Sequence, residues 1–162
     1  MASLNDPIVQ ALVHGRHIAC LASENADGSL HLTATWYVYE VGRLYLETDS
    51  TSRQARNLRA RPTASLMIDA RRPGAEFGVT AAGHAELVSG ERSHDLNQRI
   101  FRWYLSPAAM ADPRLGVLLT IPTAITIELI PTTWTAWDMG ELAKALFSGA
   151  PAPSGYFLPL DR

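Results

Sequence analysis

The stretch from residue 49 to residue 62, which reads DSTSRQARNLRARP, decides much of the fold. Its three hydroxyl residues, 50–52, are typical caps of a helix N-terminus. Residues 53–60 are good helix formers, and Pro62 stops the helix. Ala55 and Leu58 lie three residues apart, so both can face a core while the arginines face water. The stretch therefore predicts a short surface helix.

Strand-like segments lie on both sides of this helix. Residues 30–40 are rich in Thr, Trp, Tyr and Val, which favour strands, and Asp27-Gly28 before them is typical of a hairpin turn. Gly83 inside a strand predicts a bulge or a close backbone approach. Strands are expected at 18–23, 30–40, 44–48, 63–69, 76–88 and 124–130. Pro131 closes the last of these strands, and Trp134 and Trp137 lie on a further strand or on an extension of that strand. Helices are expected at 7–14, 53–60 and 93–105, with a short helix or turn at 114–120.

This order of elements points to an α+β fold, mainly β, in which about six strands form a β-barrel with two or three helices. A β-sandwich with inserted helices is the competing architecture. The chain of 162 residues contains no repeat or linker that would divide it. We therefore expect one domain, residues 1–148, and a loosely ordered tail rich in Pro and Gly at residues 149–162.

The composition excludes several classes of protein. A net charge of −2 gives no basic footprint for nucleic acid, and no apolar run approaches the roughly 20 residues that span a membrane. Residues 1–6 lack the basic start of a secretory signal, so a cytoplasmic protein is expected. A single cysteine, Cys20, excludes an internal disulfide framework. Of the 14 basic residues only Lys144 is lysine, so a site that needs a cation would have to use arginine.

Common catalytic and metal-binding motifs are absent from the sequence. There is no Gly-x-Ser-x-Gly, no Gly-x-Gly-x-x-Gly and no P-loop, which argues against a nucleophile elbow and a Rossmann-type nicotinamide domain. The five histidines are scattered, without a partner at metal-ligand spacing. We therefore assign no metal and no catalytic residue.

Two segments have the residue types of a ligand site. At the start of the helix 53–60, free backbone N–H groups, hydroxyls and the guanidinium groups of Arg53 and Arg56 could hold a phosphate. A capped, solvated surface helix is the alternative. Residues 31–37 mix small hydroxyl residues with aromatics, so this strand could bind a planar polar ligand through its backbone. An ordinary barrel strand with Trp36 in the core is the alternative.

The two tryptophans near the end of the ordered part, Trp134 and Trp137, also have more than one interpretation. Their indole rings could stack on a bound ring or close an interface. Core packing explains them equally well.

The order of these segments resembles the pyridoxamine 5′-phosphate oxidase-like family of split β-barrel flavin-binding proteins, from residue 7 to residue 140. Its anchors are residues 19–23 (ACLAS), 27–31 (DGSLH), 33–36 (TATW), 44–48 (LYLET), 52–58 (SRQARNL) with Pro62, 83–87 (GHAEL) and 137–138 (WD). The resemblance implies a six-stranded split β-barrel with flanking helices, of the FMN-binding type. It also implies a homodimer with cofactor sites at the subunit interface.

The resemblance further implies which residues contact the cofactor. The strand at residues 32–37 would line the ring and ribityl chain, while Thr48 and the Ser52-Arg53 corner match phosphate-binding positions. The family usually has a contacting lysine at the position of Gln54, and we hypothesise that Arg53 and Arg56 supply the missing charge. The implied cofactor-binding residues are Leu32, Thr33, Ala34, Thr35, Trp36, Tyr37, Glu47, Thr48, Ser52, Arg53, Gln54, Arg56 and Trp137.

FMN is the first cofactor that the resemblance implies, because its single phosphate fits a compact Ser/Arg site. A deazaflavin coenzyme is the alternative, with a phospholactyl-glutamate tail that Arg56, Arg59 and Arg61 could accommodate. Haem is the third candidate.

The implied function is an oxidoreductase that transfers hydride at flavin N5 to or from a small-molecule substrate. Residues 131–162 contain no His and only the terminal Arg162, where a pyridoxal-type phosphate would need an Arg-x-His-type motif, so a non-phosphorylated substrate is expected. A deazaflavin-dependent reductase, a non-catalytic flavin- or haem-binding module, and a dimeric barrel without a ligand are the alternatives.

Overall fold

The computed structural model describes residues 2–71, 75–153, 155, 156 and 158. The strands are β1 (Ala19–Glu24), β2 (Leu30–Thr35), β3 (Val38–Glu40), β4 (Arg43–Asp49), β5 (Thr63–Ala70), β6 (Phe77–Val88) and β7 (Ala124–Asp138). The helices are α1 (Pro7–Val13), α2 (Arg53–Ala60), α3 (Gly90–Tyr104), α4 (Pro107–Met110), α5 (Pro113–Leu119) and α6 (Met139–Leu146). All strand pairs are antiparallel, in the order β2-β1-β5-β6-β7-β4-β3, and the fold is α+β and mainly β, as predicted.

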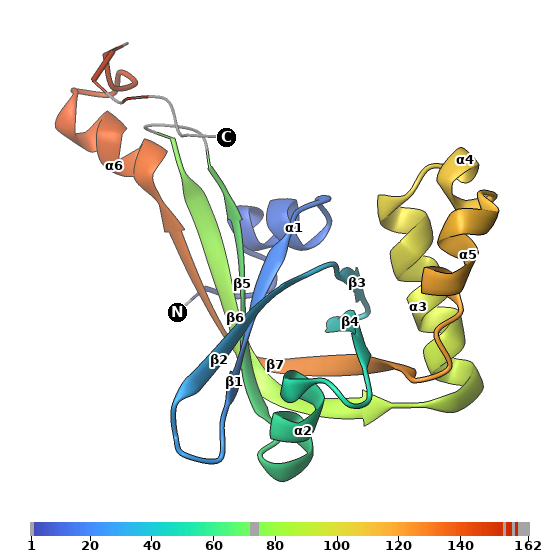
Figure 1. The fold of residues 1–162 in the computed structure, drawn as a ribbon. Helices are drawn as coiled ribbons and strands as arrows, with labels where there is room; N and C mark the ends of the chain where they lie inside the picture. Colours follow the sequence, from blue (N-terminus) through green and yellow to red (C-terminus); the bar gives the residue numbers. More distant parts are fainter. Residues whose placement is uncertain (1, 72–74, 154, 157, 159–162) are drawn as a thin grey trace.

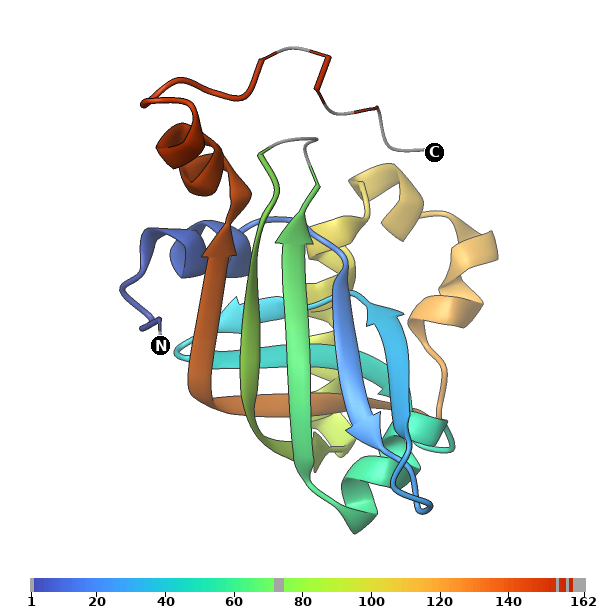
Figure 2. The same cartoon turned by 90° about the vertical axis from the view of Figure 1, so that its left-hand side faces the viewer.

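The sheet curls into a half-barrel because its two longest strands, β6 and β7, bend together (Figure 1). Their pairing register shifts between Ala82 and Gly83, opposite Pro131, which is the bulge that Gly83 predicts. A Cβ atom at Gly83 would collide with the carbonyl group of Ile130, so only glycine fits there. On one side of the bend lie β5, β1 and β2, and on the other lie β4 and β3 (Figure 2).

The strand count is seven rather than six, because residues 30–40 do not form one strand. The chain leaves the edge of β1 at Trp36 and Tyr37, crosses the open side of the half-barrel and pairs with β4 as β3. The side chain of Tyr37 turns into the core at this crossing and is 1% exposed. The last strand does not end at Pro131; it extends to Asp138, since a bulge tolerates a residue that lacks an N–H group.

Helices cover both faces of the curled sheet. Val9, Leu12 and Val13 of α1 enter the main core on the concave side. Helix α3 packs on the opposite face of β4 and β7, where Tyr45 and Val88 meet Leu96 and Ile100. These two layers position the segments that surround the cavity described below.

The helices are six rather than two or three in the described part of the chain. Helix α2 has the predicted bounds, whereas α4 lies between two predicted helices, in a segment for which no helix was predicted. Helix α6, which no pattern predicted, begins where Asp138 accepts the N–H of Glu141 at 3.1 Å. Of the predicted tail, residues 154, 157 and 159–162 lie outside the described residues, and residues 149–153 form neither helix nor strand. No helix among the described residues is long and apolar enough to cross a membrane.

Candidate functional site

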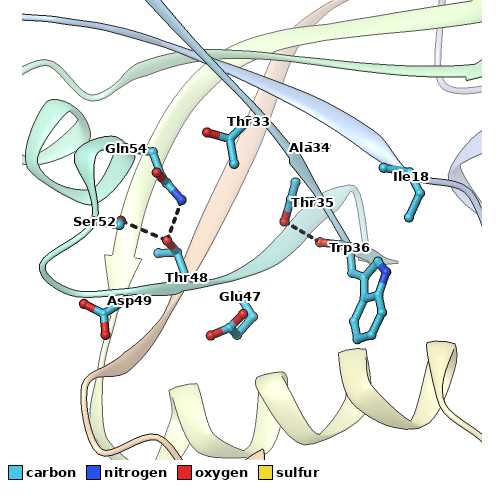
Figure 3. Close-up of a pocket in the computed structure, with 10 residues that line it drawn as sticks. All are labelled: Ile18, Thr33, Ala34, Thr35, Trp36, Glu47, Thr48, Asp49, Ser52 and Gln54. Atoms are coloured by element: carbon cyan, nitrogen blue, oxygen red, sulfur yellow. Dashed lines mark hydrogen bonds between the residues drawn. The ribbon is translucent and has the colours of Figure 1, made fainter. Parts of the chain in front are cut away.

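A cavity of about 510 Å³ lies between the end of β2, the end of β4 and the start of α2 (Figure 3). Among the described strands β2 pairs with β1 alone, so the sheet does not close between β2 and β4 and leaves this cavity open. Alternate backbone groups on the free edge of β2 are therefore unpaired and could bind a ligand. The lining residues are Ile18, Thr33, Ala34, Thr35, Trp36, Glu47, Thr48, Asp49, Ser52 and Gln54.

One end of the cavity, here called the α2 end, consists of Thr48, Asp49, Ser52 and Gln54. The Nε2 atom of Gln54 donates to the Thr48 hydroxyl at 2.8 Å, and that hydroxyl lies 3.0 Å from the Ser52 hydroxyl. Ser52 is the N-cap of α2 and accepts the N–H of Ala55 at 3.2 Å. The hydroxyl and amide groups thus form a connected chain at a helix N-terminus, as Figure 3 shows.

Two carboxylates accompany this polar chain. Burial and the charge of Asp49 raise the pKa of Glu47 above its usual value. The carboxylate of Asp49 accepts hydrogen bonds from the Thr123 hydroxyl and from the hydroxyl and N–H of Thr51, which lower the pKa of Asp49. The α2 end therefore combines neutral donors with negative charge.

The other end, here called the aromatic end, consists of Trp36 and Ile18 with Tyr104 behind them. The rings of Trp36 and Tyr104 stack with centroids 4.9 Å apart and planes 3° apart. The Tyr104 hydroxyl donates to the carbonyl of His17 at 2.6 Å and accepts the N–H of Tyr37 at 3.3 Å. Trp36 is thus held from one side by α3 while it lines the cavity.

The structure brings together eight of the thirteen residues that the sequence placed at a cofactor: Thr33, Ala34, Thr35, Trp36, Glu47, Thr48, Ser52 and Gln54. The other five lie elsewhere in this chain. Tyr37 is buried in the core, where its hydroxyl donates to the carbonyl groups of Leu12 and Gly15, and its pKa is raised by burial. Leu32 is 62% exposed on β2, and Trp137 lies against Gly78 at the far end of β7.

The two arginines expected to supply charge do not line the cavity. The guanidinium of Arg56 donates to the backbone carbonyl of Thr51. Arg53 lowers the pKa of Asp27, in the turn between β1 and β2, although hydrogen bonds from Ser29 are the larger cause. Their contribution to cofactor binding stays a prediction.

Sequence reasoning missed three contributors to the site. Asp49 directly follows Thr48, the last residue of β4 that the sequence assigned to the site. The sequence therefore identified the right strand but ended the lining one residue too early. Ile18 and Tyr104 have no local signal, because they reach the site only through the folding of α3 and β1 around Trp36. Within the described ranges, no group of three or more His, Cys, Asp or Glu side chains could hold a metal ion, and no histidine lines this cavity.

Comparisons with known proteins agree with this geometry. No curated protein matches the chain. Among solved structures, a conserved hypothetical protein, Rv2991, from Mycobacterium tuberculosis is 24% identical, with a TM-score of 0.74 over 95% of this chain and 92% of that chain. An F420 reductase is 17% identical, with a TM-score of 0.59 over 78% and 94% of the two chains. The haem storage protein HutZ from Vibrio cholerae is 18% identical, with a TM-score of 0.64 over 83% and 94%.

At these identities the structural likeness shows the fold alone, which is that of a split barrel. The sequence comparison goes further, because the family described as pyridoxamine 5′-phosphate oxidase matches residues 6–127. That range includes β1 to β6, α2, α3 and every residue that lines the cavity. The chain belongs to the pyridoxamine 5′-phosphate oxidase family.

Proposed function

We propose that this protein is an oxidoreductase that binds the tricyclic ring of a flavin or deazaflavin in the cavity between β2, β4 and α2. The observation that carries the proposal is the shape of that cavity, which has a free strand edge along one side, an aromatic residue at one end and a polar helix N-terminus at the other. A planar ring with a polar chain matches this arrangement.

The ring portion of such a cofactor fits the residues present. Trp36 offers an aromatic surface, and the edge of β2 at residues 33–35 offers backbone donors and acceptors for a heterocycle. The hydroxyl and amide groups of the α2 end suit the hydroxyls of a ribityl chain. FMN, the first cofactor implied by the sequence, brings a phosphate as well, and the α2 end of this chain offers no cation to it.

When bound, such a ring supplies hydride transfer, and the protein has only to bind and orient it. Thr33 and Thr35 would hold its edge, and Trp36, backed by Tyr104, would fix its plane and exclude water on that side. The substrate would be a small, non-phosphorylated molecule.

A homodimer is part of the proposal. The β2 edge exposes Leu30 and Leu32 at 70% and 62%, and Ile18, at the opposite end of the β1/β2 pair, is 54% exposed. A second copy of this chain would cover such apolar side chains along the strand edge. Sedimentation velocity tests this directly, because a stable monomer at micromolar concentration would contradict it.

The function itself is tested by titrating the purified protein with riboflavin, FMN, coenzyme F420 and haemin, followed by absorbance and fluorescence. We expect a flavin or deazaflavin to bind, and Ala34→Phe, which fills the cavity, to abolish binding. Ala108→Phe, on the exposed surface of α4, is the matched control and should bind as wild type does. Absence of binding for both ring types, or unchanged binding to Ala34→Phe, would rule out the proposed site.

Activity is tested separately. The bound cofactor is reduced without oxygen, and candidate acceptors are then added while the spectrum is followed. Reoxidation by an organic acceptor at a rate above that of free cofactor supports an oxidoreductase, whereas a cofactor that stays reduced with every acceptor supports a binding module.

A further inference from the structure

The charges around the α2 end do not match the charge of an FMN phosphate. Among the described residues that line the cavity there is no lysine, arginine or histidine, while Glu47 and Asp49 both belong to the lining. At pH 7 a phosphate monoester carries about 1.5 to 2 negative charges. A helix N-terminus offsets only about half of one charge.

The side chain of Gln54, at the α2 end of the cavity, is an amide and carries no charge. Gln54 uses its Nε2 group to donate to Thr48, and its Oε1 atom remains available as an acceptor. An amide that offers both a donor and an acceptor matches an alcohol, which has both as well. An ammonium group at this position would instead offer three donors and a positive charge to a dianion.

No arginine of α2 is among the residues that line the cavity. Arg56 is bound to the carbonyl of Thr51, and Arg61 forms an ion pair with Glu24 at 3.1 Å. The described lining of the α2 end therefore contains no cation that would balance the charge of a phosphate.

We infer that the α2 end selects a cofactor whose chain carries at most one negative charge there, an alcohol or a phosphodiester, over the phosphate monoester of FMN. The inference rests on the proposed function, because it specifies which member of the flavin and deazaflavin class the same cavity takes. The neutral Gln54, the two lining carboxylates and the absence of a cation from the described lining carry it together.

The experiment compares three ligands on the wild-type protein and on Gln54→Lys. Riboflavin is neutral, FMN carries the monoester, and coenzyme F420 carries a phosphodiester. We expect the wild type to bind riboflavin, F420 or both at least as tightly as FMN. Gln54→Lys should raise the affinity for FMN about tenfold, with a salt dependence that riboflavin lacks, and leave riboflavin within about twofold. Gln54→Met, which is neutral, is the matched control and should not favour FMN.

Several outcomes would overturn the inference while leaving the proposed function intact. These are a wild type that prefers FMN to both other ligands by tenfold, a Gln54→Lys variant with unchanged FMN affinity, and a selective loss of FMN affinity in Arg53→Ala or Arg56→Ala. Absence of binding for all three ligands in both proteins would overturn the proposed function together with the inference. Thermal unfolding of each variant shows that the comparison is made on folded protein.

Discussion

The two ends of the cavity are held in place by different kinds of contact. At the α2 end, the side chains of Thr48, Ser52 and Gln54 are hydrogen-bonded to one another and to the first turn of a helix. At the aromatic end, Trp36 rests on Tyr104, whose helix α3 is fixed to the sheet by an ionic cluster around a buried carboxylate and by a core layer. The charge of the α2 end can therefore change by one substitution without loss of the fold, whereas the aromatic end is part of the fold itself.

The ionic cluster is centred on Glu128, which is fully buried on β7 and faces α3. Its carboxylate accepts hydrogen bonds from Arg43 of β4 and from Arg92 of α3, the latter at 2.6 Å. Burial alone would raise the pKa of Glu128, but the two guanidinium groups hold it below its usual value. The cluster thus joins α3 to the strands that line the cavity.

The largest effect is expected for Glu128→Ala, which leaves both arginines without their partner. We expect a loss of about 2–3 kcal/mol in the free energy of unfolding at pH 7, measured by urea denaturation. Arg99→Ala breaks the exposed pair with Glu40 and is the matched control, with a loss below about 1 kcal/mol. If the two variants lose the same unfolding free energy, the ionic cluster does not hold α3 on the sheet.

The same cluster predicts a pH dependence. Because the pKa of Glu128 is lower in the folded protein than in the unfolded chain, its stabilisation is complete above the unfolded value of about 4.3. It is lost as the pH falls through the lower, folded value. The difference between wild type and Glu128→Ala should therefore shrink on acidification below pH about 4. A difference that stays constant down to pH about 3 would contradict a charged Glu128.

A smaller effect is expected for Tyr37→Phe, which removes the hydroxyl that donates to Leu12 and Gly15. The buried carbonyl groups lose a partner, and we expect a loss of about 1–2 kcal/mol in unfolding free energy. Tyr39→Phe, at a half-buried position on β3, is the control, with a change within about 0.5 kcal/mol. The affinity for flavin or deazaflavin should be unchanged in both variants. If Tyr37→Phe alone loses affinity, Tyr37 contacts the cofactor, as the sequence implied.

Next in size is Trp36→Leu, which removes the aromatic surface but keeps the α2 end. Affinities for riboflavin and FMN should fall equally, by about five- to tenfold, since stacking contributes about 1 kcal/mol. Trp103→Leu is the control, because Trp103 is exposed beside Arg16 and does not line the cavity. If the affinities for riboflavin and FMN fall by different factors, binding of the ring at the aromatic end is not independent of binding of the phosphate at the α2 end.

The comparison of the two ends also explains what the sequence could predict. Helix α2 was predicted to the residue, because its cap, its helix formers and Pro62 act locally. The bulge at Gly83 was predicted for a similar reason, since glycine marks a close approach of backbones. Thr48, Ser52 and Gln54 meet within one short segment, so their grouping followed from the same stretch.

The aromatic end could not be found in this way. Trp36 and Tyr104 are 68 positions apart in the sequence, and their stacking depends on α3 packing against β4 and β7. The orientation of Arg56 was equally hidden, because residue type does not reveal that its guanidinium turns back to Thr51. Helix α6 was missed because the strand before it was expected to close at Pro131.

The smallest effect is expected for Glu47→Gln, at the boundary between the two ends. The pKa of Glu47 is raised in the folded protein by burial and by Asp49, so its charge opposes folding above the unfolded value of about 4.3. Glu47→Gln should therefore gain less than about 1 kcal/mol at pH 7, and the gain should vanish below pH about 4, where the carboxyl is neutral in both states. Asp49→Asn should have the opposite sign at pH 7, because hydrogen bonds from Thr123 and Thr51 favour the charged form of Asp49. If both variants lose stability at pH 7, Glu47 is held as a charged group and the α2 end tolerates more negative charge than its neutral donors indicate.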